Sequence, residues 1–333
     1  MVRMTVLASG SKGNCTLVAS SRTRLLVDAG LSCREIFKRL RAVEEGIEDI
    51  DAILVTHEHQ DHVQGLSVTA RKLGIPVYFT EPTHRAWMRW MTPRKRMSYA
   101  EWIAQQKALA ASGKEPVSAG SEAEDAAQEA AEDAQRGLFD PQPIAEVLAA
   151  SAEPEETKAK PEKDPTLLPG VEYFSAGDDF SIGDISIRSF TIPHDAVDPV
   201  GFVFEIEGVR LALATDLGYV PPNVHAQLKR CDVLMLESNH DVDMLRDGPY
   251  PWSVKQRVMS RVGHLSNEAA ADFLENSYDG HAAHIVLAHL SESNNMPELA
   301  RLAAERVLAE RIGAVTNQLH LAEQHLPLRP ILM

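Results

Sequence analysis

The stretch Thr56-His57-Glu58-His59-Gln60-Asp61-His62 directly follows the apolar residues 52–55, whose composition is typical of a buried strand. His57 and His59 are two residues apart, so in an extended backbone both imidazoles point to the same side and can bind one metal ion. Asp61 and His62 come where the chain turns into the next helix, so they face differently and can bind a second ion. Imidazole and carboxylate groups suit Zn²⁺, Mn²⁺ or iron. The stretch therefore predicts a metal centre at the end of a strand rather than a solvated histidine-rich loop.

Two metal ions need more than four ligands, and three further candidates come later in the chain. His194, Asp216 and His289 each stand at the end of an apolar segment with the composition of a strand. A polar residue there is a poor choice for a core but a good position for a ligand. Any one of them alone would more often be a structural hydrogen-bonding residue. Their joint occurrence with the histidine-rich stretch favours the ligand interpretation.

The rest of the chain divides into a patterned part and an acidic segment. Short strand-like segments come first in sequential pairs and then alternate with helical ones, among them Val63–Leu73, which predicts an α/β fold with sheets inside and helices outside. Residues 101–168 lack this pattern, and between Glu101 and Pro165 there are 15 acidic and six basic residues. Such a composition buries too little apolar surface to offset its ordering entropy. We expect a low-complexity, disordered insertion within a single domain spanning residues 1–333.

Composition and charge exclude several classes of protein. The 333 residues carry 33 basic and 48 acidic side chains, a formal net charge of −15, which argues against a general nucleic-acid-coating protein. No apolar run approaches the roughly 20 residues of a membrane-spanning helix, and no signal peptide is evident. Cys15, Cys33 and Cys231 are too few and too far apart for a disulfide framework. We expect a cytoplasmic protein without a membrane partner.

The order of these candidate ligands resembles that of the metallo-β-lactamase-fold hydrolases, over residues 1–99 and 170–321. The resemblance implies an αββα sandwich with two divalent metal ions, Zn²⁺ or Mn²⁺, at one edge of the facing sheets. It also implies the ligands: His57, His59 and His194 for the first ion, Asp61, His62 and His289 for the second, with Asp216 bridging them. Asp28, in Leu26-Val27-Asp28-Ala29-Gly30, would steady a ligand loop from behind.

Four shorter segments are similar to the YycJ/WalJ subgroup of this family. They are Ala8–Thr16, Leu236–Asp241, Gly263–Asn267 and His289–Asn295. This similarity implies a DNA-directed exonuclease, with DNA favoured over RNA as substrate, and a repair protein as a candidate partner. The long acidic insertion departs from the subgroup's pattern.

The candidate catalytic residues are Asp61, His264, Glu237 and His240. His264 precedes a helix that starts near Ser266, which could place its ring over the metal ions as the proton donor to the leaving oxygen. The arrangement is similar to the His-Ser-Thr loop of the tRNA 3′-processing enzymes, in which a Glu orients the His, and Glu237 matches that place. His240 is an alternative donor. A capping role for His264 and a structural salt bridge for Glu237 remain the alternatives.

Two segments are candidates for substrate binding. Ser9, Ser11 and Asn14 lie in a turn of small residues whose hydroxyl and N–H groups could hold a phosphate, although a plain hairpin loop would look alike. Arg94, Lys95 and Arg96 end the basic segment His84–Arg96, in which Trp87 and Trp90 interleave with the cations. Such cations neutralise phosphates while Trp faces stack on unpaired bases. The alternative is an amphipathic helix whose Trp residues pack inward.

Three functions remain open at this point. The first is a dinuclear-metal phosphodiesterase or nuclease, with a DNA exonuclease as the favoured form. The second is a metallo-hydrolase of a small thioester, lactone or cyclic phosphodiester. The third is a non-catalytic binding protein on a retained fold, which a complete ligand set argues against.

Overall fold

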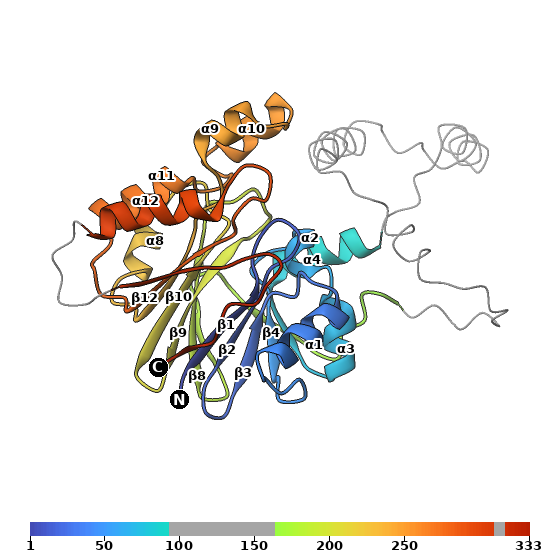
Figure 1. Cartoon of the computed structure of the whole chain (residues 1–333). Coiled ribbons are helices and arrows are strands. Elements are labelled where there is room, and N and C mark those ends of the chain that lie inside the picture. Colours follow the sequence, from blue (N-terminus) through green and yellow to red (C-terminus); the bar gives the residue numbers. More distant parts are fainter. Residues whose placement is uncertain (93–163, 310–316) are drawn as a thin grey trace, which may run out of the picture. The chain divides into compact units, whose positions relative to one another are not determined.

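Two seven-stranded sheets face each other in the computed structural model, and helices cover their outer surfaces (Figure 1). The structure describes residues 1–92, 164–309 and 317–333. Met1–Thr92 and Pro165–Met333 form one compact unit. This layered αββα arrangement confirms the predicted fold class.

The first sheet is built mainly from the N-terminal part of the chain, in the order β14-β1-β2-β3-β4-β5-β6. Strands β14 to β3 pair antiparallel, and β3 to β6 pair parallel. The strands are β1 (Arg3–Ala8), β2 (Cys15–Ala19), β3 (Arg24–Val27), β4 (Ala52–Leu54), β5 (Val77–Thr80), β6 (Val171–Phe174) and β14 (Ile331–Leu332).

The second sheet repeats this plan in the C-terminal part, in the order β13-β12-β11-β10-β9-β8-β7. Strands β7 to β10 pair antiparallel, and β10 to β13 pair parallel. The strands are β7 (Asp179–Ile182), β8 (Ile185–Thr191), β9 (Val200–Ile206), β10 (Val209–Ala214), β11 (Val233–Glu237), β12 (His284–Ala288) and β13 (Gln318–Leu321).

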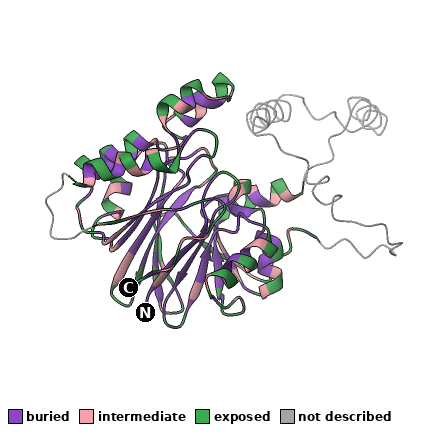
Figure 2. Cartoon of the chain, in the orientation of Figure 1, coloured by how far each residue is buried: buried purple, intermediate pink, exposed green. Residues whose placement is uncertain are grey.

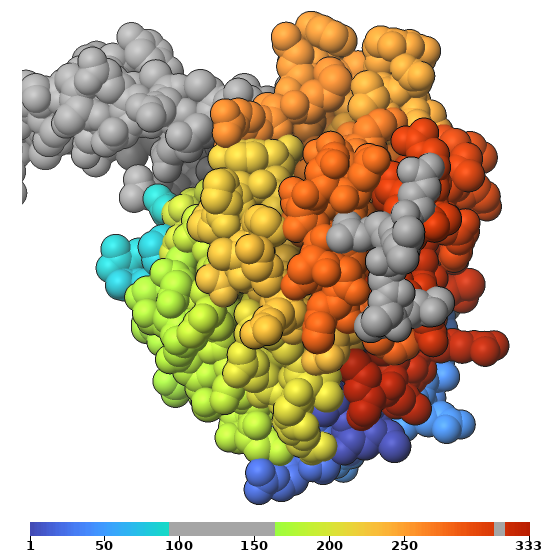
Figure 3. Space-filling view, turned by 90° about the vertical axis from the view of Figure 1, so that its left-hand side faces the viewer, coloured from blue at the N-terminus to red at the C-terminus, as the bar shows by residue number. Residues whose placement is uncertain are grey.

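The helices divide between the two outer faces. The first sheet is accompanied by α1 (Cys33–Ala42), α2 (Gln60–Val63), α3 (Leu66–Leu73) and α4 (Glu81–Met91), and the second by α8 (Pro222–Gln227), α11 (Asn267–Asn276) and α12 (Pro297–Ala309). Two short helices, α9 (Val242–Asp247) and α10 (Trp252–Val258), project beyond the strand ends around a small core of their own (Figures 1 and 3). The helix predicted over Val63–Leu73 is interrupted at Gly65, where a Cβ would lie 1.9 Å from the Leu31 carbonyl oxygen.

Buried apolar residues form three layers. In Figure 2 the strands are largely purple, which marks buried residues, and the helices have green, exposed sides. The central layer lies between the sheets and contains Phe202, Phe204 and Met4, each fully buried. One outer layer joins the first sheet to α1, α3 and α4, and the other joins the second sheet to α8, α11 and α12. Burial on both faces explains why the parallel strands read as continuous apolar runs.

Most of the predicted insertion lies outside the described residues, so its expected disorder and the single-domain assignment stay predictions. Its last residues are described: the Ser67 hydroxyl donates to the Pro165 carbonyl, and Arg71 donates to the Leu167 carbonyl, so this end runs along α3. Among the described helices, none is both long and apolar enough to cross a membrane.

Candidate metal centre

The candidate ligands meet at the edge where the carboxyl ends of the parallel strands lie. They are carried by the loops that follow β4, β8, β10 and β12. Strand pairing explains this convergence, because β3 is parallel to β4, and β10, β11 and β12 are parallel to one another. Strand β8 runs in the same direction as β10, because both are antiparallel to β9. Residues that end parallel strands come out at the same edge of a sheet.

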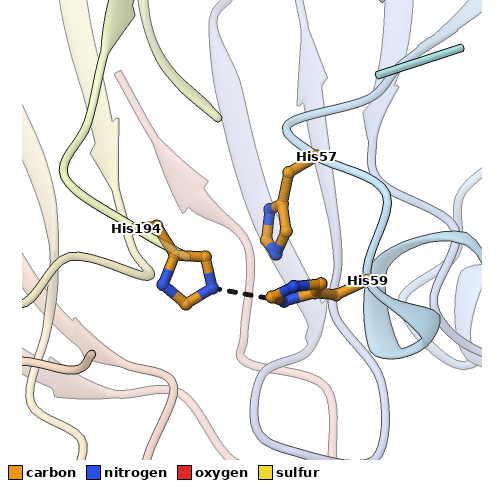
Figure 4. Close-up of side chains that lie close together, drawn as sticks. All are labelled: His57, His59 and His194. Carbon is orange, nitrogen blue, oxygen red and sulfur yellow. Dashed lines mark hydrogen bonds between the residues drawn. The ribbon is translucent and has the colours of Figure 1, made fainter. Parts of the chain in front are cut away.

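His57, His59 and His194 form the first group. One nitrogen of each ring lies within 4.8 Å of the others, and the rings converge from two loops (Figure 4). His194 Nε2 is 3.2 Å from His59 Nδ1. Burial lowers the pKa of all three imidazoles, that of His59 to about 4, so their nitrogens are available as neutral ligands.

Asp61, His62 and His289 form the second group. Asp61 Oδ2 lies 3.4 Å from His62 Nε2 and 3.4 Å from His289 Nε2. Asp216 belongs to both sides, because it groups with His57 and His62 and also with His289. The structure thus brings together all seven predicted ligands, with Asp216 placed between the two groups as a bridging ligand would be.

Two features of the cluster fit divalent metal ions. Within the described part of the chain, His57 Nε2, Asp216 Oδ2 and His289 Nε2 are buried without a hydrogen bond. Burial alone would lower the pKa of His62, but the carboxylates of Asp61, Asp216 and Asp28 outweigh it and raise that pKa well above its usual value. Unused buried ligand atoms and concentrated negative charge both call for cations, and imidazole with carboxylate is a donor set for such ions.

Asp28 supports His62 from behind. Its carboxylate accepts hydrogen bonds from Thr56 N (2.9 Å), Thr56 Oγ1 (2.9 Å) and His62 Nδ1 (2.8 Å). This leaves His62 Nε2 directed to the other ligands. Asp28 thus lies where the resemblance implied, and its effect on metal binding stays a prediction. Asp28, Asp216 and His289 have positive φ angles of 62°, 62° and 56°, an uncommon backbone conformation that clusters at functional sites.

The chain is similar to known proteins over most of its length. It matches the metallo-beta-lactamase superfamily over residues 8–250. The chain belongs to this superfamily. It is 35% identical to exodeoxyribonuclease YycJ of Bacillus anthracis over 310 residues, which cover 93% of this chain and 90% of that protein. It is 32% identical to exodeoxyribonuclease WalJ of Streptococcus pneumoniae, over 92% of this chain and 88% of that protein.

Solved structures agree on the fold. The metallo-beta-lactamase fold protein YhfI from Bacillus subtilis aligns over 98% of this chain and 99% of its own, with a TM-score of 0.55 and 14% sequence identity. Membership of the metallo-beta-lactamase superfamily, together with the clustered ligands, makes the protein a metal-dependent hydrolase.

In this metallo-beta-lactamase-fold protein a buried carboxylate joins the metal centre to His264. Glu237 accepts hydrogen bonds from His264 Nδ1 (2.7 Å) and His289 Nδ1 (2.8 Å), and also from the backbone N–H groups of Leu217 (2.8 Å) and Leu265 (3.2 Å). Burial lowers the pKa of His264, but Glu237 raises it by more. The structure thus brings Glu237 and His264 into contact, as the resemblance implied, and the catalytic role of this pair stays a prediction.

His240 is placed differently. Its ring is buried, its Nδ1 makes no hydrogen bond to any described residue, and burial lowers its pKa to about 4. Its backbone pairs with Ser266 in an isolated bridge. A role for His240 as proton donor stays a prediction, and the geometry favours His264.

The turn predicted to hold a phosphate instead supports the ligands. The Asn14 amide exchanges hydrogen bonds with Gly10 and donates from Nδ2 to Asp61 Oδ2 (3.0 Å), and Nδ2 also lies 3.0 Å from His62 Nε2. This close approach requires Gly30, because a Cβ there would lie 1.6 Å from the Asp61 carbonyl oxygen.

The two serines of this turn differ. Ser9 is buried and accepts a hydrogen bond from the His289 backbone N–H (2.8 Å), whereas Ser11 is exposed. The substrate-binding prediction therefore does not fit Ser9 or Asn14, whose hydrogen-bonding groups face the metal ligands. Ser11 remains accessible to a substrate.

The basic and aromatic segment is only partly described. Arg94, Lys95 and Arg96 lie outside the described residues. Trp87 is fully buried and packs against Phe79 and His84, so it follows the inward-packing alternative, whereas Trp90 is 39% exposed. Stacking on a base therefore does not fit Trp87.

Several residues around the site were not singled out as functional from the sequence. Thr56 binds Asp28, and Ser238, Asn239, Asn267 and Asn295 form a buried network behind His264 and His289. The available signal was Asn239, two residues after the apolar strand β11, but an asparagine there is by itself equally typical of a turn.

Proposed function

We propose that the protein is a dinuclear-metal phosphodiesterase that degrades DNA from its ends. The observation that carries this proposal is the joint presence of two ligand groups sharing Asp216 and a Glu237–His264 pair in contact with them. Zn²⁺ or Mn²⁺ bound there would lower the pKa of water and neutralise phosphate charge. The first ion would be held by His57, His59 and His194, and the second by Asp61, His62 and His289.

The protein's own residues would supply orientation and a proton. Glu237 accepts from His264 Nδ1, so Nε2 of that ring is the nitrogen left to protonate the leaving oxygen. His264 Nδ1 lies 3.9 Å from Asp216 Oδ1, which puts this donor next to the metal ligands. Asp28 and Asn14 hold His62 and Asp61 in place.

The choice of DNA and of end-directed cleavage is supported by the relatives. YycJ and WalJ are both exodeoxyribonucleases, and this chain spans 90% and 88% of their lengths at 35% and 32% identity. Because the protein has a net charge of −15, it would bind the DNA backbone only locally, where the metal ions and a few basic side chains offset the charge of the phosphates. Within the described residues, the exposed loop residues Ser11 and Lys12 lie beside the ligand-supporting Asn14. Arg94–Arg96 are proposed as further phosphate contacts.

An end-labelling experiment tests the proposal. Protein reconstituted with Mn²⁺ or Zn²⁺ is incubated with 5′- or 3′-labelled single- and double-stranded DNA, RNA of the same sequence, and circular single-stranded DNA. We expect stepwise loss of linear DNA and intact circles, with Asp216→Asn inactive as a control for contamination. Cleavage of circular DNA would contradict the exonuclease assignment. A preference for RNA would contradict the assignment of DNA as the substrate. Turnover of a thioester or lactone with no loss of either nucleic acid would overturn the proposal as a whole.

A further inference from the structure

Three loops that follow or precede core elements meet behind the metal centre. The first, residues 238–241, follows β11 and Glu237. The second, residues 263–267, leads into α11 and carries His264. The third, residues 289–296, follows β12 and begins with the ligand His289. Their meeting point is made by Asn239, Asn267 and Asn295, which we call the asparagine clasp.

The side chains of Asn267 and Asn295 pair through their amides. Asn267 Nδ2 donates to Asn295 Oδ1 (2.8 Å), and Asn295 Nδ2 donates back to Asn267 Oδ1 (3.0 Å). Asn267 Oδ1 also accepts from Ser238 Oγ (2.6 Å). Asn295 Nδ2 further donates to the carbonyls of Ser238 and Asn239, both at 2.9 Å. One pair of amides thus ties all three loops together.

Asn239 connects the backbones next to His264 and at His289. Its Nδ2 donates to the His289 carbonyl (2.8 Å), and its backbone N–H donates to the carbonyl of Leu265 (2.8 Å), the residue after His264. Its own carbonyl accepts from the Ser291 N–H (2.8 Å). A shift of either histidine-bearing loop would therefore break a hydrogen bond to this one residue.

The clasp is fully buried, with Asn239, Asn267 and Asn295 exposed by 4%, 2% and 6%. Buried amides weaken a core unless their hydrogen bonds are made, and a satisfied network fixes one arrangement more strictly than apolar packing does. Glu237 must reach His264 Nδ1 and His289 Nδ1 at once, at 2.7 and 2.8 Å, which demands a fixed separation between their loops.

We propose that the asparagine clasp is a positioning device that sets His264 and His289 relative to Glu237. Asn239 acts through His289, and so through the metal site, whereas Asn267 acts through His264. None of the three asparagines touches a reacting atom. The part of this proposal that concerns His289 depends on the metal centre but not on the proposed function. The part that concerns His264 rests also on the proposed function.

Zinc binding tests the arm through His289. In Asn239→Ala we expect the dissociation constant of the weaker Zn²⁺ equivalent to rise about 10–100-fold, as for other changes behind metal ligands, measured by chelator competition. Asn317→Ala is the matched control, because Asn317 Nδ2 also donates to Tyr278 Oη (3.1 Å) and the Ala282 carbonyl (2.6 Å), at the opposite end of the second sheet. It should leave both constants unchanged at a similar loss of Tm.

Unchanged zinc binding in folded Asn239→Ala, or an equal loss in Asn317→Ala, would overturn the inference. If Asn239→Ala does not fold, Asn239→Ser takes its place, because its shorter side chain cannot reach the His289 carbonyl.

A double-mutant cycle tests the arm through His264. Asn267→Asp keeps the shape but loses the donor to Asn295 Oδ1, and a flipped Asn295 amide would lose its bonds to Ser238, Asn239 and the Met296 N–H. We expect kcat on a small chromogenic phosphodiester to fall about 10–100-fold with KM unchanged. In a His264→Ala background the same change should cost almost nothing.

Equal losses of kcat in the two backgrounds would refute action through His264. If the wild-type protein does not cleave phosphodiesters, the proposed function fails, while the zinc measurement still decides the inference for His289.

Discussion

Asp28 and Asp216 occupy matching places in the two sheets and have different surroundings. Each comes within two residues of the end of a strand, β3 or β10, that is antiparallel to one neighbour and parallel to the other. Both have a φ angle of 62° and both are buried. They also face the same ring: Asp28 Oδ2 lies 2.8 Å from His62 Nδ1, and Asp216 Oδ2 lies 3.5 Å from His62 Nε2.

The difference lies in how each carboxylate uses its hydrogen-bonding capacity. Asp28 accepts three hydrogen bonds from Thr56 and His62, so it is fully used inside the protein. Asp216 Oδ2 has no hydrogen bond to any residue in the described ranges. The repeated strand arrangement thus provides two equivalent positions for an aspartate. Where neighbouring groups donate hydrogen bonds to the carboxylate, as at Asp28, it supports a ligand; where no described neighbour does so, as at Asp216 Oδ2, it is free to bind metal itself. Asparagine tolerates this backbone conformation, so the same substitution can be compared at both positions.

Asp216→Asn should have the largest effect. Loss of a shared carboxylate affects both ions, so we expect at least one metal equivalent to be lost and turnover to fall on the order of 10³-fold or more. Metal content by elemental analysis and turnover of a phosphodiester check this. Two equivalents still bound with wild-type affinity would remove Asp216 from the bridging position.

His264→Ala should come next and should separate proton donation from metal binding. We expect kcat to fall about 10²–10⁴-fold, because a positioned general acid contributes that much, with KM and metal content nearly unchanged. Steady-state kinetics and metal analysis on the same preparation measure both. Loss of metal from this variant would place His264 among the ligands, which its position near Asp216 and His289 makes a real alternative.

Asp28→Asn should have a smaller effect than the same change at Asp216. An Asn keeps one acceptor oxygen but directs an NH₂ group at Thr56 or His62, so the orientation of His62 is loosened while every ligand is kept. We expect about a 10–100-fold loss of metal affinity or turnover. Equal losses at positions 28 and 216, measured by chelator competition, would contradict the division of roles between the two aspartates.

The ligands could be predicted from the sequence because their signal is local. His57 to His62 lie in one stretch, and His194, Asp216 and His289 are each marked by an apolar strand just before them. The layered fold followed from the same strand and helix periodicities. Elements too short to show a period, such as α9 and α10 with six and seven residues, were not predicted.

Roles that depend on distant contacts could not be predicted. Asn14 reaches Asp61 across 47 positions and Asn239 reaches His289 across 50, and nothing in the local pattern marks these pairs. Trp87 shows the same limit, because its helix is compatible with both interpretations and only packing against Phe79 decides between them. The sequence therefore indicates which residues can bind a metal better than which residues hold them in place.

The smallest effect of a substitution is expected at the edge opposite the metal centre, where hydrogen bonds connect a turn of one sheet to a turn of the other. Asp184, after β7, accepts from Ser20 Oγ (2.7 Å) and Arg22 Nε (3.2 Å) of the β2–β3 turn. Hydrogen bonds from Thr23 and Ser20 are the main causes that lower its pKa to about 2, below its value in the unfolded chain. Its contribution to stability is therefore present above about pH 4 and is lost as the pH falls through about 2.

Asp184→Asn should remove this part of the acid sensitivity. Its Tm should lie slightly below that of the wild type at neutral pH, and the two values should converge toward pH 2, as measured by thermal melts across this range. A constant difference in Tm at all pH values would show that the carboxylate's charge does not contribute to joining the sheets. Asp184 would then differ from the buried Asp28 and Asp216, whose negative charges both face His62.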